Sequence, residues 1–587
     1  MRLKILTGIQ IFLIMAIIPV LFVPESFARN AIHLAITIII LSLIELLYIK
    51  RKNIEIILNN IEKIAVVILT ILFILMLSIF DIINSGFLDI NNLANIYPNL
   101  VAYLILIWAY LIFLPSIFIA SGIVIINLVC FLLSDRTGGG YKKGTYKCCL
   151  IMIILASIMY VFSTYPGIWI QDDVKSVWND ISNRNFRAWH ILGYELFVFL
   201  CSLIYPSTFS VNIVQMIVWI LLNAYILKVL QEENGINMKI YTITLLIVAA
   251  PLNYLEVMYK DVVFSMGILA ITVGLYHVVK NNKVIWQDIL ALALGGAVSS
   301  LCRHAGNIAV FLAFIVAIIY CAIIKQKKVL KCFLGLMIFQ VVVYLAVNVF
   351  LFQLLSVTEN PAYIKYTMPM VTIGSAVSNG VEFDDADTEV LEMVMPVEEW
   401  GQCYDKYWAD TISRSYGKIG DRIHIVSKLV DSEQYGLKLL KINLKLLLHH
   451  PCIYLKSIFD MNNIIWKMAT PNDGYEWALC SVTKNEQITY HVPFVYTDLW
   501  TQFMWHNPFT NVVFARGGVA LYIILLSGTI WIIKKKKHLL IALIPISIYD
   551  SMLFITIPAQ DPRYILPGIE CAIFLVAVVF GTDKETR

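Results

Sequence analysis

The chain has 587 residues, of which 59% are hydrophobic and only 14% are charged, whereas about 25% of the residues in an ordinary soluble domain are charged. This composition excludes a soluble globular protein, because too few polar side chains are available to cover its surface. The net charge of +4 is too small to indicate a nucleic-acid-binding protein. Apolar runs of 17 or more residues recur along the chain, each long enough to cross a hydrocarbon core of about 30 Å. The sequence predicts an all-α polytopic membrane protein with roughly 13 to 15 transmembrane helices.

The predicted spans follow one another along most of the chain. In order they are residues 5–23, 31–49, 64–80, 100–134, 148–164, 209–230, 240–257, 262–279, 285–301, 308–324, 333–355, 513–533, 539–557 and 564–580. Ser26 and Ala28 after the first run are typical of the cleavage site of a signal peptide. The many later spans favour a first run that is retained as a transmembrane span. Residues 100–134 carry no charge over 35 residues, so we expect Pro115 to kink this run or divide it into a hairpin. Residues 191–205 are too few to cross and include Glu195, and we expect them to lie along the interface.

Lysine and arginine gather in short clusters between the apolar runs, and such clusters mark the cytoplasmic side of a membrane protein. They all fall on one side if residues 100–134 cross once and residues 191–205 do not cross. The clusters lie within residues 50–52, 136–147, 280–283, 325–331 and 534–537. The extracytoplasmic side then receives residues 165–210, 258–261, 303–307 and 560–563, together with one large polar insertion.

This topology divides the chain into four parts. Residues 1–146 hold additional N-terminal spans, and residues 147–355 form a transmembrane core whose first extracytoplasmic loop is residues 165–210. Residues 356–512 form an extracytoplasmic domain of mixed helix and loop, and residues 513–587 contain the last spans. Between Glu382 and Glu399 the domain carries eight acidic residues and no basic one. We interpret this run as a solvated surface, with cation or substrate capture as the alternative.

Ionisable residues are concentrated in the four small extracytoplasmic segments, close to the ends of spans. A charge at membrane depth costs about 2.5 to 3.5 kcal/mol, so residues kept there are candidates for a functional site. They are Asp172, Asp173, His190, Glu256, Lys260, Asp261, Arg303, His304, Asp561 and Arg563. A carboxylate can accept a proton from an attacking hydroxyl group, and arginine binds phosphate oxygens in a bidentate manner. Together they indicate group transfer from a phosphate-linked donor, although each alone also fits a solvated loop, a helix-end ion pair or a lipid-headgroup anchor.

Short motifs in a fixed order carry a resemblance to a known family. They are TYPGIWIQDD from Thr164, WH at Trp189, YKDVVFS from Tyr259, LCRHAGN from Leu301, HPCIYLKS from His450 and DPRYILP from Asp561. Between residues 146 and 581 the chain resembles the GT-C superfamily of polytopic glycosyltransferases. It is most similar to a bacterial branch with additional N-terminal spans, related to protein mannosyltransferases and aminoarabinose transferases.

The resemblance implies a role for each matched residue. Asp172 follows a Pro-Gly pair after four residues and corresponds to the essential acid of the first extracytoplasmic loop, with Asp173 in support. Asp261 corresponds to a second acid on the same face. The residues expected to bind the donor are His190, Lys260, Arg303, His304 and Arg563. In relatives the histidine is usually followed by proline, which Ile191 replaces here.

The function that this resemblance implies is that of an inverting glycosyltransferase in the cell membrane. It would take a sugar from a polyprenyl-phosphate-linked donor and transfer it to a glycan, lipid or protein acceptor of the cell envelope, at the extracytoplasmic face. No nucleotide cofactor is expected, and a divalent metal is left open because some members of the superfamily use one. A transporter or flippase for lipid-linked glycans is one alternative, although paired repeats and midplane charges are typical of that class. A polymerase of lipid-linked glycans is the other.

Overall fold

The computed structural model describes residues 60–76, 114–133, 144–163, 165, 167, 173–233, 235–359, 365–413, 433–468, 511 and 513–581. These residues form helices and connecting segments without a β-strand, apart from isolated bridges at Arg187–Thr358 and Trp408–Ala559. Seven of the described helical segments are long and apolar enough to cross a membrane. The protein is therefore an all-α polytopic membrane protein, as its composition predicts. The predicted spans at 5–23 and 31–49 lie outside the described residues.

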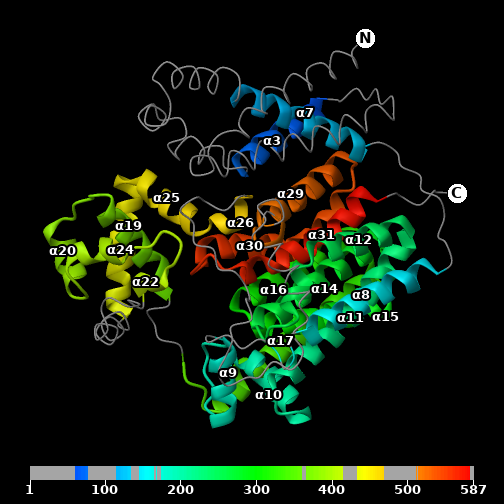
Figure 1. The fold of residues 1–587 in the computed structure, drawn as a ribbon, viewed down its shortest axis with the longest axis horizontal. Helices are drawn as coiled ribbons and strands as arrows, with labels where there is room; N and C mark the ends of the chain where they lie inside the picture. The colour runs from blue at the N-terminus through cyan, green and yellow to red at the C-terminus, as the bar shows by residue number, and fades with distance from the viewer. Residues whose placement is uncertain are drawn as a thin grey trace.

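The seven long segments account for most of the bundle in Figure 1. They are α8 (Thr145–Ser163), α11 (Thr208–Glu233), α14 (Lys260–Asn281), α16 (His304–Ile323), α17 continued by η3 and α18 (Lys327–Leu354), η5 with α30 (Lys537–Thr556), and η6 with α31 (Pro562–Phe580). The other apolar helices are α3 (Asn60–Met76), α7 (Leu114–Leu133), α10 (Leu192–Ile204), α12 (Gly235–Val248), α15 (Trp286–Cys302) and α29 (Gly518–Ile533). The 13 residues of α10 are too short to cross a membrane, in agreement with the sequence.

One predicted span is wrong in its extent. Residues 240–257 were expected to form a single helix, but α12 ends at Val248 and Ala249 has a φ of 54°. A short helix, α13 (Ala250–Tyr254), then begins with Pro251 in its first turn. Because proline has no backbone N–H and favours the start of a helix, α12 does not continue through it. The described helix α7 likewise has Pro115 in its first turn and runs unbroken to Leu133, and the earlier part of that predicted span lies outside the described residues.

Helix α14 forms the centre of the bundle. Its side chains from Asp261 to Val279 are all buried, and it contacts α11, α15, α30 and α31 (Figure 1). A Cβ atom on Gly267 would lie 2.9 Å from the carbonyl oxygen of Gly295 in α15, and one on Gly295 would lie 2.9 Å from that of Gly267. Glycines allow two helix backbones to approach this closely. Their contact places the start of α14 beside the end of α15.

Neighbouring helices that follow one another run in opposite directions, so the connections between them lie at two ends of the bundle. Residues 280–283, 325–331 and 534–537, which carry the basic clusters, connect helices at one end. Lys260, Arg303 and Arg563 lie at the other end, which we call the site end. The described helices therefore separate the basic clusters from the candidate site, as hydropathy and charge predict.

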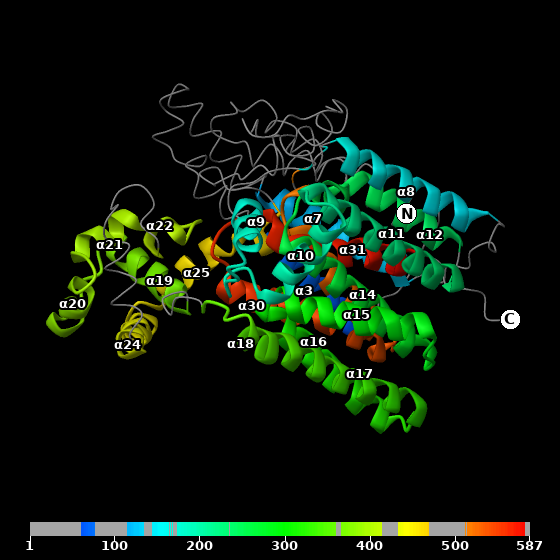
Figure 2. The same cartoon turned by 90° about the horizontal axis from the view of Figure 1, so that it is seen from below.

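A group of helices beyond the spans forms a second unit, at the left of Figures 1 and 2. It contains α19 (Thr367–Ser378), α20 (Asp385–Glu392), α21 (Val397–Cys403), α22 (Asp410–Ser413), α24 (Glu433–His449) and α25 (Pro451–Met461), and α26 (Asn463–Trp466) follows it. The backbone N–H of Ala409 donates to the carbonyl of Pro558, 2.8 Å away, beside the Trp408–Ala559 bridge. The unit is thus attached to the segment that leads to Arg563.

The acidic run of this unit is partly neutralised by a later helix. Asp384 caps α20 by accepting a hydrogen bond from the backbone N–H of Asp387 at 2.8 Å. Lys445 of α24 lies 2.9 Å from the Asp384 carboxylate and 2.7 Å from that of Asp387. Asp384 stays exposed while it joins two helices, so a solvated surface describes this part of the run.

We expect a membrane-impermeant maleimide added to intact cells to modify Cys452 and to spare Cys148. Both thiols are exposed, and they lie in the first turns of α25 and α8, at opposite ends of the bundle. Peptide mapping by mass spectrometry measures the extent of modification at each cysteine. Both should react in permeabilised cells, and modification of Cys148 alone in intact cells would reverse the expected orientation.

Candidate functional site

Three ionisable side chains from distant parts of the chain meet at the site end. Asp261 lies in the first turn of α14, Arg303 between α15 and α16, and Arg563 in η6. The Asp261 carboxylate forms an ion pair with Arg303, and its second oxygen lies 3.8 Å from Nε of Arg563. The Asp261 side chain is only 1% exposed. We call Asp261, Arg303, Arg563 and Asp561 the ionic core, since a second carboxylate joins them.

Asp561 is that second carboxylate, and it forms an ion pair with Arg563. Its Oδ2 lies 2.9 Å from Nε of Arg563, and its Oδ1 accepts the backbone N–H of Arg563 at 3.0 Å. Arg303, in contrast, has Asp261 as its only carboxylate partner among the described residues. Including the neighbouring Lys260, three cations face two carboxylates, and this excess of positive charge favours an anionic ligand.

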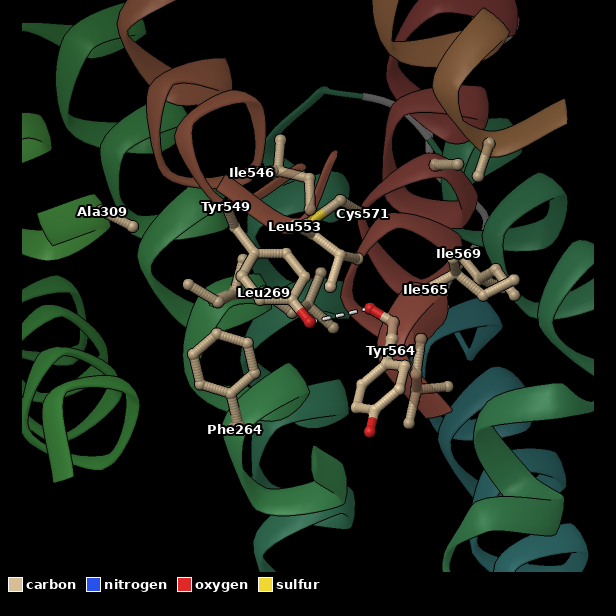
Figure 3. Packing of buried hydrophobic residues seen from close by; sticks show 14 of the residues in the cluster. Phe264, Leu269, Ala309, Ile546, Tyr549, Leu553, Tyr564, Ile565, Ile569 and Cys571 are labelled. Atoms are coloured by element: carbon tan, nitrogen blue, oxygen red, sulfur yellow. Dashed lines mark hydrogen bonds between the residues drawn. The ribbon is translucent and has the colours of Figure 1, made fainter. Parts of the chain in front are cut away.

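Aromatic side chains fix the position of Arg303. Its Nη1 donates to the hydroxyl oxygen of Tyr549 at 3.0 Å, and that hydroxyl donates to the backbone carbonyl of Tyr564 at 2.8 Å, the dashed line in Figure 3. The ring centre of Tyr564 lies 4.7 Å from the guanidinium carbon. Phe264 packs against Tyr549 with 4.9 Å between ring centres (Figure 3). Cation–π contact and the hydrogen bond therefore both hold this guanidinium group in place.

Arg563 is held in the same way. Its guanidinium carbon lies 4.8 Å from the ring centre of Tyr259 and 5.1 Å from that of Tyr564. Tyr564 thus lies against both arginines of the ionic core. Sequence reasoning missed these tyrosines, because Tyr is common at the ends of membrane spans and gives no separate signal there.

Lys260 links the ionic core to the first loop. Its Nζ donates to the backbone carbonyl of Trp189 at 3.4 Å, in the connection between α9 (Asp173–Asn183) and α10. The next residue, His190, is fully buried and its Nε2 lies 2.9 Å from Oγ of Ser176 in α9. His190 therefore packs within the loop, directly after the Trp189 carbonyl that Lys260 binds.

A cluster of polar side chains holds this loop together, and we call it the loop cluster. Arg187 lies 2.8 Å from the Asp180 carboxylate through Nε and donates to Ser176 through Nη2 at 2.8 Å. Its backbone N–H donates to the Glu195 carboxylate at 3.2 Å. Burial, and then the nearby Asp180 carboxylate, raise the pKa of Glu195 to about 8. The Arg187 guanidinium group thus pairs with Asp180, whereas its backbone N–H bonds Glu195, and Glu195 keeps its proton at neutral pH.

The expected catalytic base, Asp172, lies outside the described residues, and Asp173 is the first residue of α9. The glycine of the preceding Pro-Gly pair is described. Gly167 has a φ of 113°, and a Cβ atom there would lie 2.9 Å from Nδ2 of Asn212, which itself donates to the Glu256 carbonyl at 2.8 Å. Both the backbone angle and the lack of space require glycine, so Gly167 packs closely against α11.

Two other matched positions are His304 and Ile191. His304 starts α16 directly after Arg303 and is exposed, and it lies close enough to Lys260 and Arg303 to interact electrostatically with both. Ile191, which precedes α10, has a φ of 64°, a rare angle for a β-branched residue. Proline cannot adopt this angle because its ring fixes φ near about −65°. The chain therefore enters α10 in a way that the usual proline would prevent.

A buried arginine near the ionic core was also missed. Arg516 donates through Nη1 to Oε1 of Gln560 at 3.2 Å and through Nη2 to Oδ1 of Asn463 at 2.7 Å. Gln560 in turn donates to the Asp460 carbonyl at 2.9 Å and directly precedes Asp561. Arg516 thus joins α26 to the segment that carries the ionic core. In the sequence it is a lone arginine before an apolar run, which is typical of a span boundary.

No group of three or more His, Cys, Asp or Glu side chains is placed to hold a metal ion within the described part of the chain. Comparison of the chain with protein-family models, with curated proteins and with solved structures gave no match. The chemistry of the site is therefore inferred from its own residues and geometry.

Proposed function

We propose that the protein is an inverting glycosyltransferase with a GT-C-like architecture, which transfers a sugar from a polyprenyl-phosphate-linked donor to a cell-envelope acceptor at the extracytoplasmic face. The observation that supports this proposal is the ionic core at the site end. Two arginines held by aromatic rings, with Lys260 nearby, outnumber their carboxylate partners. Such an arrangement suits a phosphate group that lies at the end of the apolar helices, with its lipid tail among them.

In this reaction Asp172 accepts the proton of the acceptor hydroxyl group as its oxygen attacks the anomeric carbon. The bond from that carbon to the phosphate oxygen breaks, and the polyprenyl phosphate leaves with the bonding electrons. Attack from the face opposite the phosphate inverts the configuration of the sugar. Arg303 and Arg563 stabilise the charge that develops on the leaving phosphate, and Asp261 orients both guanidinium groups in the absence of substrate.

Deletion of the gene in its host, followed by mass analysis of envelope glycans and lipids, tests the proposal. We expect one sugar to be missing from one polymer or lipid, and the wild-type gene to restore it. The Asp172→Asn variant should fail to restore it at equal membrane abundance, because an amide cannot accept the proton. Full restoration by Asp172→Asn would remove Asp172 as the base, and an unchanged envelope would count against the transferase.

A transporter or polymerase of lipid-linked glycans is the second candidate, and one buried carboxylate favours it. Glu570 in α31 is buried within the bundle, and one of its oxygens accepts a hydrogen bond from Ser265 of α14 at 3.0 Å. Ionisable groups at this depth often belong to ion or substrate pathways. Deletion would then cause lipid-linked glycan to accumulate, either untranslocated or unpolymerised, without loss of a single sugar from a finished product.

A further inference from the structure

Helix α24 exposes a row of leucines that its own unit does not cover. Leu437, Leu440, Leu444, Leu447 and Leu448 are between 37% and 69% exposed. At about 100° per residue along an α-helix, these five side chains fall within an arc of about 100°. They form one continuous apolar face, which we call the leucine face.

The opposite side of α24 packs within the unit. Its buried residues include Tyr435, Leu439, Ile442, Asn443 and Leu446, and these fall within a separate arc of about 100°. Asn443 donates to the backbone carbonyl of Pro369 at 3.0 Å, so this side faces α19. The helix therefore already has a core-facing side, and the leucine face is additional to it.

Three lysines of α24 lie directly beside the leucine face, along one of its two edges. Lys438, Lys441 and Lys445 fall within an arc of about 60°. Lys445 pairs with Asp384 and Asp387, whereas Lys438 and Lys441 are exposed and form no ion pair within the described residues. A leucine face bordered by lysines is the pattern of a helix that lies on a membrane surface.

The helix after α24 joins this surface to a membrane span. Phe459 of α25 packs edge-on against Phe554 near the end of α30, with 5.3 Å between ring centres. The neighbouring side chains Leu455 and Ile555 are exposed, so apolar surface continues from the span onto α25. In Figure 2 α24 is seen end-on, whereas α16 and α17 run across the view. Helix α24 thus lies across the direction of the spans, one helix away from the end of α30.

We propose that the leucine face of α24 docks on the lipid surface at the site end, with Lys438 and Lys441 in contact with the phosphates of anionic lipids. The apolar side chains that follow α24 favour lipid over a soluble partner, because Leu455 of α25 is exposed and so is Ile555 of α30, a helix long and apolar enough to cross a membrane. Lysines beside an anionic surface strengthen such docking. The docked helix holds its unit over the segment that carries Arg563, and this inference does not depend on the reaction proposed above.

Photo-crosslinking in nanodiscs tests the docking with the full-length protein. The purified chain carries p-benzoylphenylalanine in place of Leu444, and mass spectrometry detects lipid adducts after irradiation. We expect lipid adducts, several-fold more in nanodiscs of phosphatidylglycerol than in those of phosphatidylcholine. The matched control carries the same crosslinker in place of Met393, which is also exposed but lies at the end of α20, the helix of the unit farthest from the spans in Figures 1 and 2.

A charge-reversal variant separates the two parts of the inference. With Lys438→Glu and Lys441→Glu added, the yield in phosphatidylglycerol should fall to the phosphatidylcholine level, since each lysine near an anionic surface contributes about fivefold to binding. Unchanged thermal unfolding verifies that the variant is folded. A Leu444 yield no higher than the Met393 yield overturns the docking, and so do adducts that join two copies of the chain. An unchanged lipid preference in the charge-reversal variant overturns the role of the lysines.

Discussion

We expect the Asp261→Asn variant to lose the proposed sugar transfer and to unfold more easily than the wild type, by about 3 to 5 kcal/mol. The side chain is buried between two arginines, and an amide leaves Arg303 without a carboxylate among the described residues. Arg563 keeps Asp561 at 2.9 Å, so most of the cost falls on Arg303. Denaturant unfolding in detergent measures the stability, and transfer from a lipid-linked donor measures the activity.

The matched Arg303→Gln variant should lose less stability, because Asp261 still faces Arg563 at 3.8 Å. Combining the two substitutions removes both charges of the pair, so the double variant should be more stable than Asp261→Asn alone while remaining inactive. This non-additivity is the sign of a direct interaction. Stability losses that simply add would show that Asp261 and Arg303 do not depend on each other.

The grouping of Asp261, Arg303 and Arg563 could be predicted from the sequence because it follows from two simple properties. Apolar segments of about 20 residues cross a membrane, and basic loops mark one side, so polar residues after an even number of crossings share an end. The close glycine contact between α14 and α15 was not needed for this prediction. Hydropathy and the basic loops therefore place Arg303 and Arg563 at the same end as Asp261, although they lie 42 and 302 positions after it.

The partners within the site could not be predicted, because they depend on how helices rotate and pack. Tyr549 and Tyr564 look like ordinary interface residues in the sequence, yet both contact Arg303. The contact between His190 and Ser176 of α9 likewise gave no signal in the sequence. The break at Ala249 was missed for a related reason, since hydropathy averages composition and carries no information on backbone angles.

Glu195 should make the stability of the protein fall as pH rises, and the Glu195→Gln variant should remove this fall. The pKa of the carboxyl group is raised from 4.5 to about 8 by burial and by Asp180, so the folded state holds the proton more tightly than the unfolded state. The contribution is fully present below about pH 4.5 and is lost as pH rises through about 8, with a slope of about 1.4 kcal/mol per pH unit. Glutamine keeps the shape and cannot ionise, so the variant should be the more stable protein at pH 9.

Unfolding measured from pH 5 to pH 9 checks this, with the exposed Glu389→Gln as the control that keeps the wild-type slope. A wild-type slope in Glu195→Gln would show that the carboxyl pair is not its origin.

Activity should follow the same pattern, because the loop cluster supports the Trp189 carbonyl that binds Lys260 beside the ionic core. Ionisation of Glu195 places a second negative charge beside Asp180, while the Arg187 guanidinium group pairs with Asp180, and this repulsion loosens the loop. The proposed sugar transfer should therefore decline above about pH 8 in the wild type and persist to higher pH in Glu195→Gln.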